Sequence, residues 1–251
     1  MRRFSKEPTL NLIIDIGNNS TKYYLFNGNH IVLHTRRANG SYGIIKDWSR
    51  DYTFKKSIVS SVTGTDKAIY EELESLGCPT VRFDSKVTTP LTIKYRTPET
   101  LGSDRLAAAL GAWSIAPGKN LLVIDSGSAI TFDFVDSCGA YHGGNIAPGV
   151  RMRLKALHDY TACLPVVEKE GETPALGYDT ETAIRSGVIR GICHEINGYI
   201  DEIKGKYGDV LVFLTGGDEK TLINNIKNRI FADKYLVAKG LNRILQDYSN
   251  E

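Results

Sequence analysis

Two acidic residues stand where apolar strands should end, and each is followed by a turn of small and polar residues. Asp15 closes the apolar part of LNLIIDIGNNSTKYYLF, residues 10–26, and Asp125 closes that of LLVIDSGSAITFDFV, residues 121–135. Because an unpaired buried charge is unfavourable, a carboxylate at the tip of a core strand is expected to meet a cation or a polar ligand. The similar surroundings of the two acids predict a duplicated fold with one acidic turn in each half.

The residues after each acid have the chemistry that binds phosphate. A nucleoside triphosphate and its metal ion need backbone amides, small hydroxyl residues and carboxylates. After Asp15 the chain offers Ile16, Gly17, Asn18, Asn19, Ser20, Thr21 and Lys22, and after Asp125 it offers Ser126, Gly127 and Ser128. Neither turn has the spacing of a P-loop. An acid and a glycine after a strand can also serve backbone conformation alone, so it is the pair of turns that favours phosphate binding.

The remaining patterns alternate strands and helices. Period-two alternation and turn residues predict strands, and apolar residues at helical spacing predict helices. Strands are predicted over 10–16, 21–26, 30–35, 57–62, 121–125, 129–135, near 141 and over 209–215, with a turn over 142–149 and an Asn27-Gly28-Asn29 hairpin. Helices are predicted over 65–77, 98–117, 150–161, 179–208, 220–230 and 240–248, with Asp179 or Thr180 capping the long one.

This order predicts an α/β protein of two domains, each with a mixed sheet and flanking helices. Pro117-Gly118 is the predicted boundary, which gives domains 1–116 and 117–251. The alanines at 107–109 permit close helix packing, and packing within the chain is the favoured use.

Composition excludes several classes of protein. With 41% hydrophobic and 24% charged residues the chain is typical of a soluble globular protein, and its net charge of +2 does not favour a nucleic-acid partner. Its four cysteines form no C-x-x-C pair and its five histidines have no metal-binding spacing. The apolar run from Leu10 is too short and polar for a signal peptide or a membrane span, so a cytoplasmic protein is expected.

In combination, several motifs resemble those of one known family. The segments DIGN from Asp15, TLGSDR, IDSGSAITFD and GGNIAPG occur in the order found in type III pantothenate kinases, and the resemblance runs from about Leu10 to Gly240. It implies two ribonuclease-H-like domains of the sugar kinase and actin superfamily. It also implies ATP-dependent phosphorylation of the pantothenate 4′-hydroxyl, the first step of coenzyme A biosynthesis. The implied cofactors are Mg²⁺ with ATP and a monovalent cation, K⁺ or NH₄⁺, and the implied assembly is a homodimer.

The resemblance also implies roles for individual residues. Asp15 through Lys22 would form the first phosphate loop, Ser128 would lie near the ATP phosphates, and Asp125 would bind the monovalent cation. Pantothenate would contact Tyr95, Gly102, Ser103, Asp104, Arg105 and Thr180, with Asp104 accepting the hydroxyl proton. The chemistry fits, because an arginine can clamp a carboxylate through two hydrogen bonds. Taken alone, Asp104 is more typical of a surface helix acid paired with a neighbouring charge.

Two departures and two alternatives accompany this interpretation. Asn19 stands where the family commonly has Thr or Ser, and Ser128 replaces the usual Thr, so nucleotide affinity is the property expected to change. One alternative is a non-catalytic regulator on the same scaffold, which the presence of Asp104, Arg105 and both acidic turns disfavours. The other is a kinase or phosphohydrolase for a different small alcohol, since one fold hosts many reactions.

Overall fold

Residues 9–64, 67–84 and 86–248 are described by the structure, a computed structural model, and their contacts divide the chain into two units. Unit 1 takes in the chain up to Ile115 and resumes at Leu236, whereas unit 2 is the continuous segment Ala116–Tyr235. The first two residues of the predicted helix 65–77 lie outside the described residues. None of the described helices is both long enough and apolar enough to cross a membrane.

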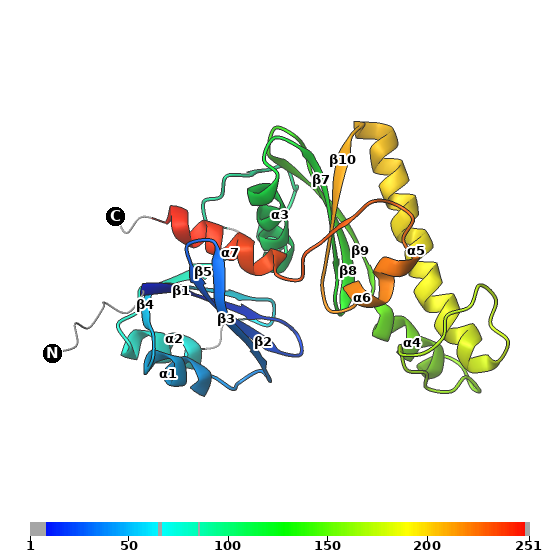
Figure 1. Ribbon diagram of the computed structural model, residues 1–251, viewed down its shortest axis with the longest axis horizontal. Helices are drawn as coiled ribbons and strands as arrows, with labels where there is room; N and C mark the ends of the chain where they lie inside the picture. The colour runs from blue at the N-terminus through cyan, green and yellow to red at the C-terminus, as the bar shows by residue number, and fades with distance from the viewer. Residues whose placement is uncertain (1–8, 65–66, 85, 249–251) are drawn as a thin grey trace. The chain divides into compact units, whose positions relative to one another are not determined.

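Unit 1 is built on a five-stranded sheet in the order β3-β2-β1-β4-β5 (Figure 1). Its strands are β1 (Thr9–Ile16), β2 (Thr21–Asn27), β3 (His30–Arg37), β4 (Thr53–Ser61) and β5 (Thr80–Phe83). The first three form an antiparallel meander, and β4 and β5 are added in parallel. The predicted hairpin is confirmed, because Asn27 pairs with His30 and Gly28 takes the positive φ of 57° that the two-residue turn requires.

Helices cover both faces of this sheet. They are α1 (Gly43–Ser49), α2 (Lys67–Ser75), α3 (Ser103–Ile115) and α7 (Leu236–Asp247), with a short 3₁₀ turn η1 (Pro98–Thr100) and a short strand β6 (Thr92–Ile93). Leu10, Leu12 and Ile14 of β1 share a core with residues of α1 and α2, and Figure 1 shows α3 and α7 over the opposite face. Because side chains alternate along a strand, Asp15 lies on the α3 and α7 face of β1.

The α3–α7 contact decides where the last helix belongs. A side chain at Gly111 would overlap the carbonyl oxygen of Leu236, and one at Gly240 would overlap that of Ala107. The two helices therefore meet almost backbone to backbone, which confirms the close helix packing predicted for the alanine run. The compact units therefore differ from the predicted domain 117–251. Helix α7 packs with the first half of the chain, because the small residues Ala107 and Gly111 of α3 let its backbone approach closely.

Unit 2 repeats the strand order of unit 1. Its sheet runs β11-β10-β7-β8-β9, with β7 (Asn120–Ser126), β8 (Ala129–Val135) and β9 (Ala140–Pro148) antiparallel, and β10 (Val210–Thr215) and β11 (Phe231–Ala232) parallel. Its helices are α4 (Val150–Asp159), α5 (Thr180–Tyr207), α6 (Glu219–Leu222) and the 3₁₀ turn η2 (Ile223–Asn225). Counting from the first strand of each unit, the five positions correspond, as the duplicated acidic turns predict.

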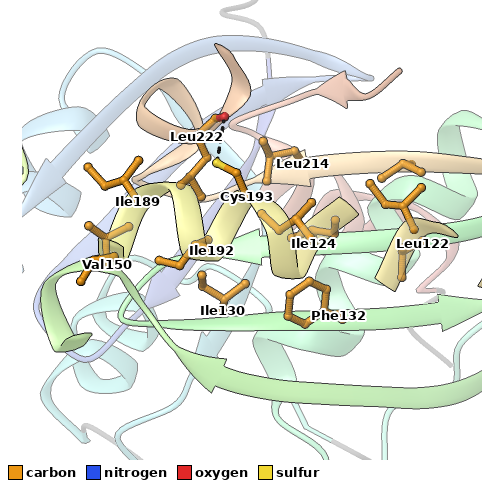
Figure 2. Close-up of a cluster of buried hydrophobic side chains, with 14 of the residues drawn as sticks. Leu122, Ile124, Ile130, Phe132, Val150, Ile189, Ile192, Cys193, Leu214 and Leu222 are labelled. Atoms are coloured by element: carbon orange, nitrogen blue, oxygen red, sulfur yellow. Dashed lines mark hydrogen bonds between the residues drawn. The ribbon is translucent and has the colours of Figure 1, made fainter. Parts of the chain in front are cut away.

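The core of unit 2 lies between α5 and one face of the sheet. Figure 2 shows Ile192 and Cys193 of α5 facing Ile124 and Phe132 of β7 and β8. The Cys193 thiol donates a hydrogen bond to the Leu222 carbonyl at 3.6 Å, and burial raises the pKa of Cys193 to about 11. Since Ile124 faces this core, its neighbour Asp125 lies on the opposite face of β7.

Three element predictions were wrong. The predicted helix 98–117 is interrupted at Leu101 and Gly102, so η1 and α3 are separate. The predicted turn 142–149 is the body of β9, where Gly144 allows the backbone to approach Phe132 of β8. The predicted helix 220–230 ends with η2. Apart from these, α1, β5, β6 and β11 were not predicted, because each is short and has no clear periodicity.

Candidate active site

The first acidic turn joins β1 to β2. Asp15 is opposite Lys22 in the antiparallel ladder, and the Lys22 Nζ lies 3.2 Å from the Asp15 Oδ2. The Asp15 side chain is 8% exposed, whereas that of Lys22 is 41% exposed. The carboxylate is therefore largely shielded from water and its cationic partner reaches the surface. This pair places one negative and one positive group at the base of the turn.

The turn itself is held by residues that the motif did not include. Within it, the Gly17 amide donates to the Ser20 carbonyl at 3.0 Å. From the segment after β3, the Asn39 amide group donates to the carbonyls of Gly17 and Asn18. From β3 itself, Arg36 Nε donates to Ser20 Oγ at 2.6 Å. The sequence around Asn39 predicts a loop and nothing more, so no signal in the spacing linked it to this turn.

Helix α3 begins with residues that were predicted to contact the substrate. Ser103 is its first residue, and its hydroxyl accepts a hydrogen bond from Ser60 Oγ of β4 at 3.0 Å. The Asp104 Oδ1 accepts a hydrogen bond from the Arg105 amide at 2.8 Å. The carboxylate thus accepts from an amide in the first turn of its own helix, at the end where the helix dipole favours negative charge. Ser60, fully buried, is a second residue that sequence reasoning missed.

Arg105 and Tyr95 form one stacked pair. The guanidinium carbon of Arg105 lies 5.6 Å from the centre of the Tyr95 ring, and Arg105 is only 5% exposed. A charged group at this depth favours an anionic ligand, because burial strengthens electrostatic interactions. The resemblance gave Gly102, Ser103, Asp104 and Arg105 within one motif and Tyr95 apart from it, and the structure groups the Tyr95 ring with the start of α3.

A pocket of about 270 Å³ opens beside Gly102 and Ser103. It is lined by the ends of β1, β4 and β5 and by Tyr70 of α2. Ligands of open α/β sheets bind at the carboxyl ends of parallel strands, which is where this pocket lies. Burial raises the pKa of the Tyr70 hydroxyl, so at neutral pH this group is a neutral donor in the pocket wall.

The second acidic turn, in unit 2, joins β7 to β8. Asp125 is half-buried and pairs with Thr131 of β8 on one side and Thr215 of β10 on the other. Its turn is enclosed by glycines: a side chain at Gly216 would overlap Ser126 O, and one at Gly149 would overlap the carbonyls of Gly127 and Ser128. Gly216 also has a φ of 102°, which favours glycine.

A buried ion pair supports the same turn. The Asp218 amide donates to the Ser126 carbonyl at 3.1 Å, and the Asp218 carboxylate accepts from Lys169 Nζ. Their side chains are 9% and 15% exposed. The Ser126 hydroxyl is fully buried and has no hydrogen-bond partner within the described part of the chain. By contrast, Asp133 of β8 is structural, because the Tyr141 hydroxyl donates to it at 2.6 Å in the core.

The sequence of the chain is similar to those of known proteins over most of its length. The sequence signature of type III pantothenate kinases matches residues 11–202, which is most of the chain. The chain belongs to the type III pantothenate kinase family. A type III pantothenate kinase of Bacteroides fragilis (strain YCH46) is 49% identical over 241 residues, which cover 96% of this chain and 99% of the relative.

Solved structures extend the likeness to more distant proteins. A Campylobacter jejuni protein described as a Baf family transcriptional activator is 23% identical, covers 94% of this chain and 98% of its own, and gives a TM-score of 0.61. A ROK family glucokinase of Streptomyces griseus, solved with glucose and AMPPNP, is 10% identical, with coverages of 94% and 98% and a TM-score of 0.52. At these identities the likeness concerns the fold alone, and it confirms the predicted sugar kinase and actin-like fold.

The donor set of this family member suits Mg²⁺ that arrives with a nucleotide. The described residues contain no group of three or more His, Cys, Asp or Glu side chains that could hold a metal ion by themselves. Mg²⁺ in nucleotide sites is held by one or two carboxylates, by water and by the phosphates. Asp15, shielded from water at the base of a turn whose backbone is held by hydrogen bonds, therefore fits a metal that is bound in part by its nucleotide.

Thr180, the last predicted substrate residue, begins α5 in unit 2. It is exposed, and the residue before it is the N-cap: Asp179 Oδ1 accepts from the Thr182 amide at 2.8 Å, which completes a capping box. This hydrogen bond lowers the pKa of Asp179. The predicted cap is confirmed, and the cap fixes the backbone that carries the Thr180 hydroxyl.

Proposed function

We propose that the protein transfers the γ-phosphoryl group of ATP to the 4′-hydroxyl of pantothenate, giving 4′-phosphopantothenate and ADP as the first step of coenzyme A biosynthesis. Membership of the type III pantothenate kinase family supports the reaction. The observation that carries the proposal is the start of α3, where a carboxylate, a buried arginine and a tyrosine ring lie together.

In this proposal Asp104 is the proton acceptor. The pantothenate hydroxyl oxygen attacks the γ-phosphorus, the bond from the γ-phosphorus to the β,γ-bridging oxygen breaks, and the hydroxyl proton passes to the Asp104 carboxylate. The Arg105 amide holds one oxygen of that carboxylate, so the group is oriented before the acceptor arrives. Orientation matters because phosphoryl transfer depends mainly on positioning and charge neutralisation.

Arg105 is proposed to bind the pantothenate carboxylate. Its guanidinium is planar and can bind a carboxylate through two hydrogen bonds. The Tyr95 ring restricts the guanidinium, and the start of α3 adds a positive dipole nearby. Thr180 is proposed as a further hydroxyl contact to the acceptor, and Gly102 and Ser103 as backbone contacts.

The turn from Asp15 to Lys22 is proposed to bind the ATP phosphates as a unit, and Ser128 in unit 2 is proposed to contact them as well. Asp15 would hold Mg²⁺ through oxygen, directly or through water, and the ion would neutralise charge on the phosphates. The chain's own contribution is a turn whose backbone is fixed before ATP binds. The Ser128 hydroxyl lies in a turn whose backbone is likewise fixed, since the Gly149 amide donates to the Ser128 carbonyl at 3.1 Å.

Asp125 is proposed to bind a monovalent cation, K⁺ or NH₄⁺. A half-buried carboxylate beside a turn with closely packed carbonyl groups offers the oxygen ligands that such hard cations prefer. Dependence of the rate on K⁺, with Na⁺ as the comparison, tests this part separately.

A homodimer in the cytoplasm completes the proposal. Six large apolar side chains are exposed within one stretch of unit 2: Ile146, Met152, Tyr160, Val166, Leu176 and Tyr178. Clusters of exposed apolar residues mark interaction surfaces. All four cysteines are free thiols, as is usual in a reducing compartment.

The deciding experiment replaces Asp104 by Asn and measures ADP release with ATP, Mg²⁺, K⁺ and pantothenate. Removing a general base should lower kcat by roughly 10²- to 10⁴-fold while ATP binding persists. Asp47→Asn is a matched control, because Asp47 is an exposed helix acid that forms its ion pair with the exposed Arg50. Full turnover in Asp104→Asn would contradict the assigned role.

A substrate panel separates the proposed function from its alternatives. The wild-type protein should release ADP with pantothenate and not with other small alcohols. Release with a different alcohol would indicate another kinase, and release without any acceptor would indicate a phosphohydrolase. A folded protein that binds ATP and transfers to no acceptor would favour the regulator.

A further inference from the structure

One side chain outside the predicted phosphate-binding motif directs both its donor and its acceptor group to the first turn. Asn39 Nδ2 donates to the Gly17 carbonyl at 2.9 Å and to the Asn18 carbonyl at 3.2 Å. Its Oδ1 accepts from the Thr21 hydroxyl at 2.9 Å. A side-chain amide has two N–H donors and one carbonyl acceptor, so both kinds of group are engaged with a single turn.

The position of Asn39 makes this arrangement informative. Asn39 is exposed and lies on the segment after β3, where water could satisfy its amide. An exposed asparagine contributes little to a hydrophobic core, so these hydrogen bonds stabilise the conformation of the turn rather than the packing of the unit. The turn is also held by Arg36, whose Nε donates to Ser20 Oγ at 2.6 Å.

The hydrogen bonds to Asn39 fix the direction in which the turn presents its amides. In a trans peptide the N–H points away from the carbonyl of the preceding residue. The carbonyls of Gly17 and Asn18 point toward Asn39, so the N–H groups of Asn18 and Asn19 point away from it. Successive backbone N–H groups on one side of a turn form an anion-binding concavity.

The Thr21 hydroxyl is engaged in the same network. Thr21 is fully buried, and its hydroxyl hydrogen is donated to Asn39. That hydrogen is therefore not the one that a phosphate oxygen would accept, and Thr21 acts on the turn through Asn39. Ser20 differs, because it accepts from Arg36 and keeps its own hydroxyl hydrogen as a donor.

We infer that Asn39 is a positioning residue for the ATP phosphates, which it orders through the carbonyls of Gly17 and Asn18 without touching the nucleotide. The inference rests on the proposed function, since it assigns the first turn to ATP. It predicts that loss of the Asn39 amide weakens nucleotide binding and leaves acceptor binding intact, because Asn39 has no hydrogen bond to the start of α3 among those described.

The test compares Asn39→Ala and Asn39→Asp with the wild type by calorimetric titration with Mg²⁺ and AMPPNP. Losing two donors to the turn should weaken AMPPNP binding about tenfold in Asn39→Ala. Asn39→Asp keeps the shape and the acceptor for Thr21, loses both donors and adds a negative charge, so its affinity should fall further. The KM for ATP should rise in parallel while the KM for pantothenate stays unchanged.

Ser41→Ala is the matched control on the same segment. Ser41 is exposed, and its backbone carbonyl rather than its hydroxyl accepts the hydrogen bond from Tyr23. This variant should bind AMPPNP like the wild type. Melting temperatures of all variants, measured without ligand, report whether unit 1 stays folded.

A double-mutant cycle tests the connection to Thr21. Thr21→Val removes the hydroxyl and nearly preserves the volume of the side chain. If Thr21 acts through Asn39, the double variant should bind AMPPNP no more weakly than Asn39→Ala alone. Fully additive losses would instead mean that Thr21 contacts the phosphates independently, and would overturn the network.

The outcomes separate the two proposals. Wild-type AMPPNP affinity in both folded Asn39 variants would overturn the positioning role while leaving the kinase assignment intact. Failure of the wild-type protein to bind AMPPNP at all would overturn the assignment of the first turn to ATP. An equal rise of both KM values in Asn39→Ala would indicate a general structural effect and would also overturn the inference.

Discussion

The two units have the same strand order and the same strand–acid–turn arrangement, but they hold their turns by different means. In unit 1 the turn after Asp15 is held by side chains: Asn39 and Arg36 donate to it, and Lys22 pairs with the acid. In unit 2 the turn after Asp125 is held by close backbone approach at Gly149 and Gly216. The same topology therefore supports its acidic turn mainly through side-chain hydrogen bonds in unit 1, and through close backbone packing, backbone hydrogen bonds and the Lys169–Asp218 ion pair in unit 2.

The difference shows which substitutions each turn should tolerate. A side chain added at Gly17 would approach Ser20 O no closer than 3.4 Å, and Gly17 has no positive φ. Gly216 has neither the space nor an ordinary φ. The first turn should therefore tolerate an added side chain at its glycine but be sensitive to the loss of hydrogen-bond donors. The second turn should be sensitive to an added side chain and less sensitive to the loss of donors.

The largest expected effect is that of Gly216→Ala. A methyl group there meets Ser126 O and the Asp125 carboxylate in a backbone conformation that alanine rarely adopts, so we expect a loss of about 3 kcal/mol of stability or more. Gly17→Ala should cost about 1 kcal/mol or less. Denaturant unfolding of both variants measures the difference. Equal losses would contradict the contrast between the turns.

A second prediction separates the two acids by the ion that each one is proposed to bind. Asp15→Asn should raise the KM for Mg²⁺-ATP about tenfold, because it removes a charged oxygen ligand and leaves Lys22 without its partner. Asp125→Asn should instead raise the K⁺ concentration for half-maximal rate about tenfold. Both constants are measured for both variants by ADP release. If each variant shifted both constants equally, the acids would not have separate roles.

The smallest effect concerns thiol reactivity, which also differs between the units. Cys138 and Cys163, both in unit 2, are exposed, whereas Cys78 and Cys193 are buried. The thiolate is the reactive form, and a pKa of about 11 leaves Cys193 with roughly one thiolate in a thousand at pH 8. Burial also raises the pKa of Cys78. A thiol titration of the native protein at pH 8 should therefore show two fast groups, and four fast groups would contradict the buried pair.

Much of the fold was predictable because its elements are locally regular. Apolar runs ending in an acid and a turn predicted β1 and β7, and the Asp179 cap with its helical period predicted α5. Predictions failed where tertiary contact decides. Glycines in β9 suggest a turn, yet Gly144 is required by the approach of Phe132 in the neighbouring strand. No local pattern shows that α7 packs with α3.

The candidate site likewise contains residues that the sequence could predict and residues that it could not. The residues of the motifs are adjacent in sequence, so resemblance identified Asp15, Asp104 and Asp125 as candidates. The residues that hold them are distant: Asn39 reaches Gly17, and Ser60 reaches Ser103, through contacts that only the folded chain creates. Spacing cannot predict such contacts, because they depend on strand register and on the conformation of a loop.

The return of α7 to unit 1 also bears on how the chain is made. Unit 2 is continuous in sequence and can begin to fold once its last strand has left the ribosome. Unit 1 starts first but is completed last, because Ala107 and Gly111 of α3 await Leu236 and Gly240. A nascent or truncated chain that stops before Leu236 would leave this small-residue surface uncovered, so unit 1 can complete its fold only after unit 2 has been synthesised.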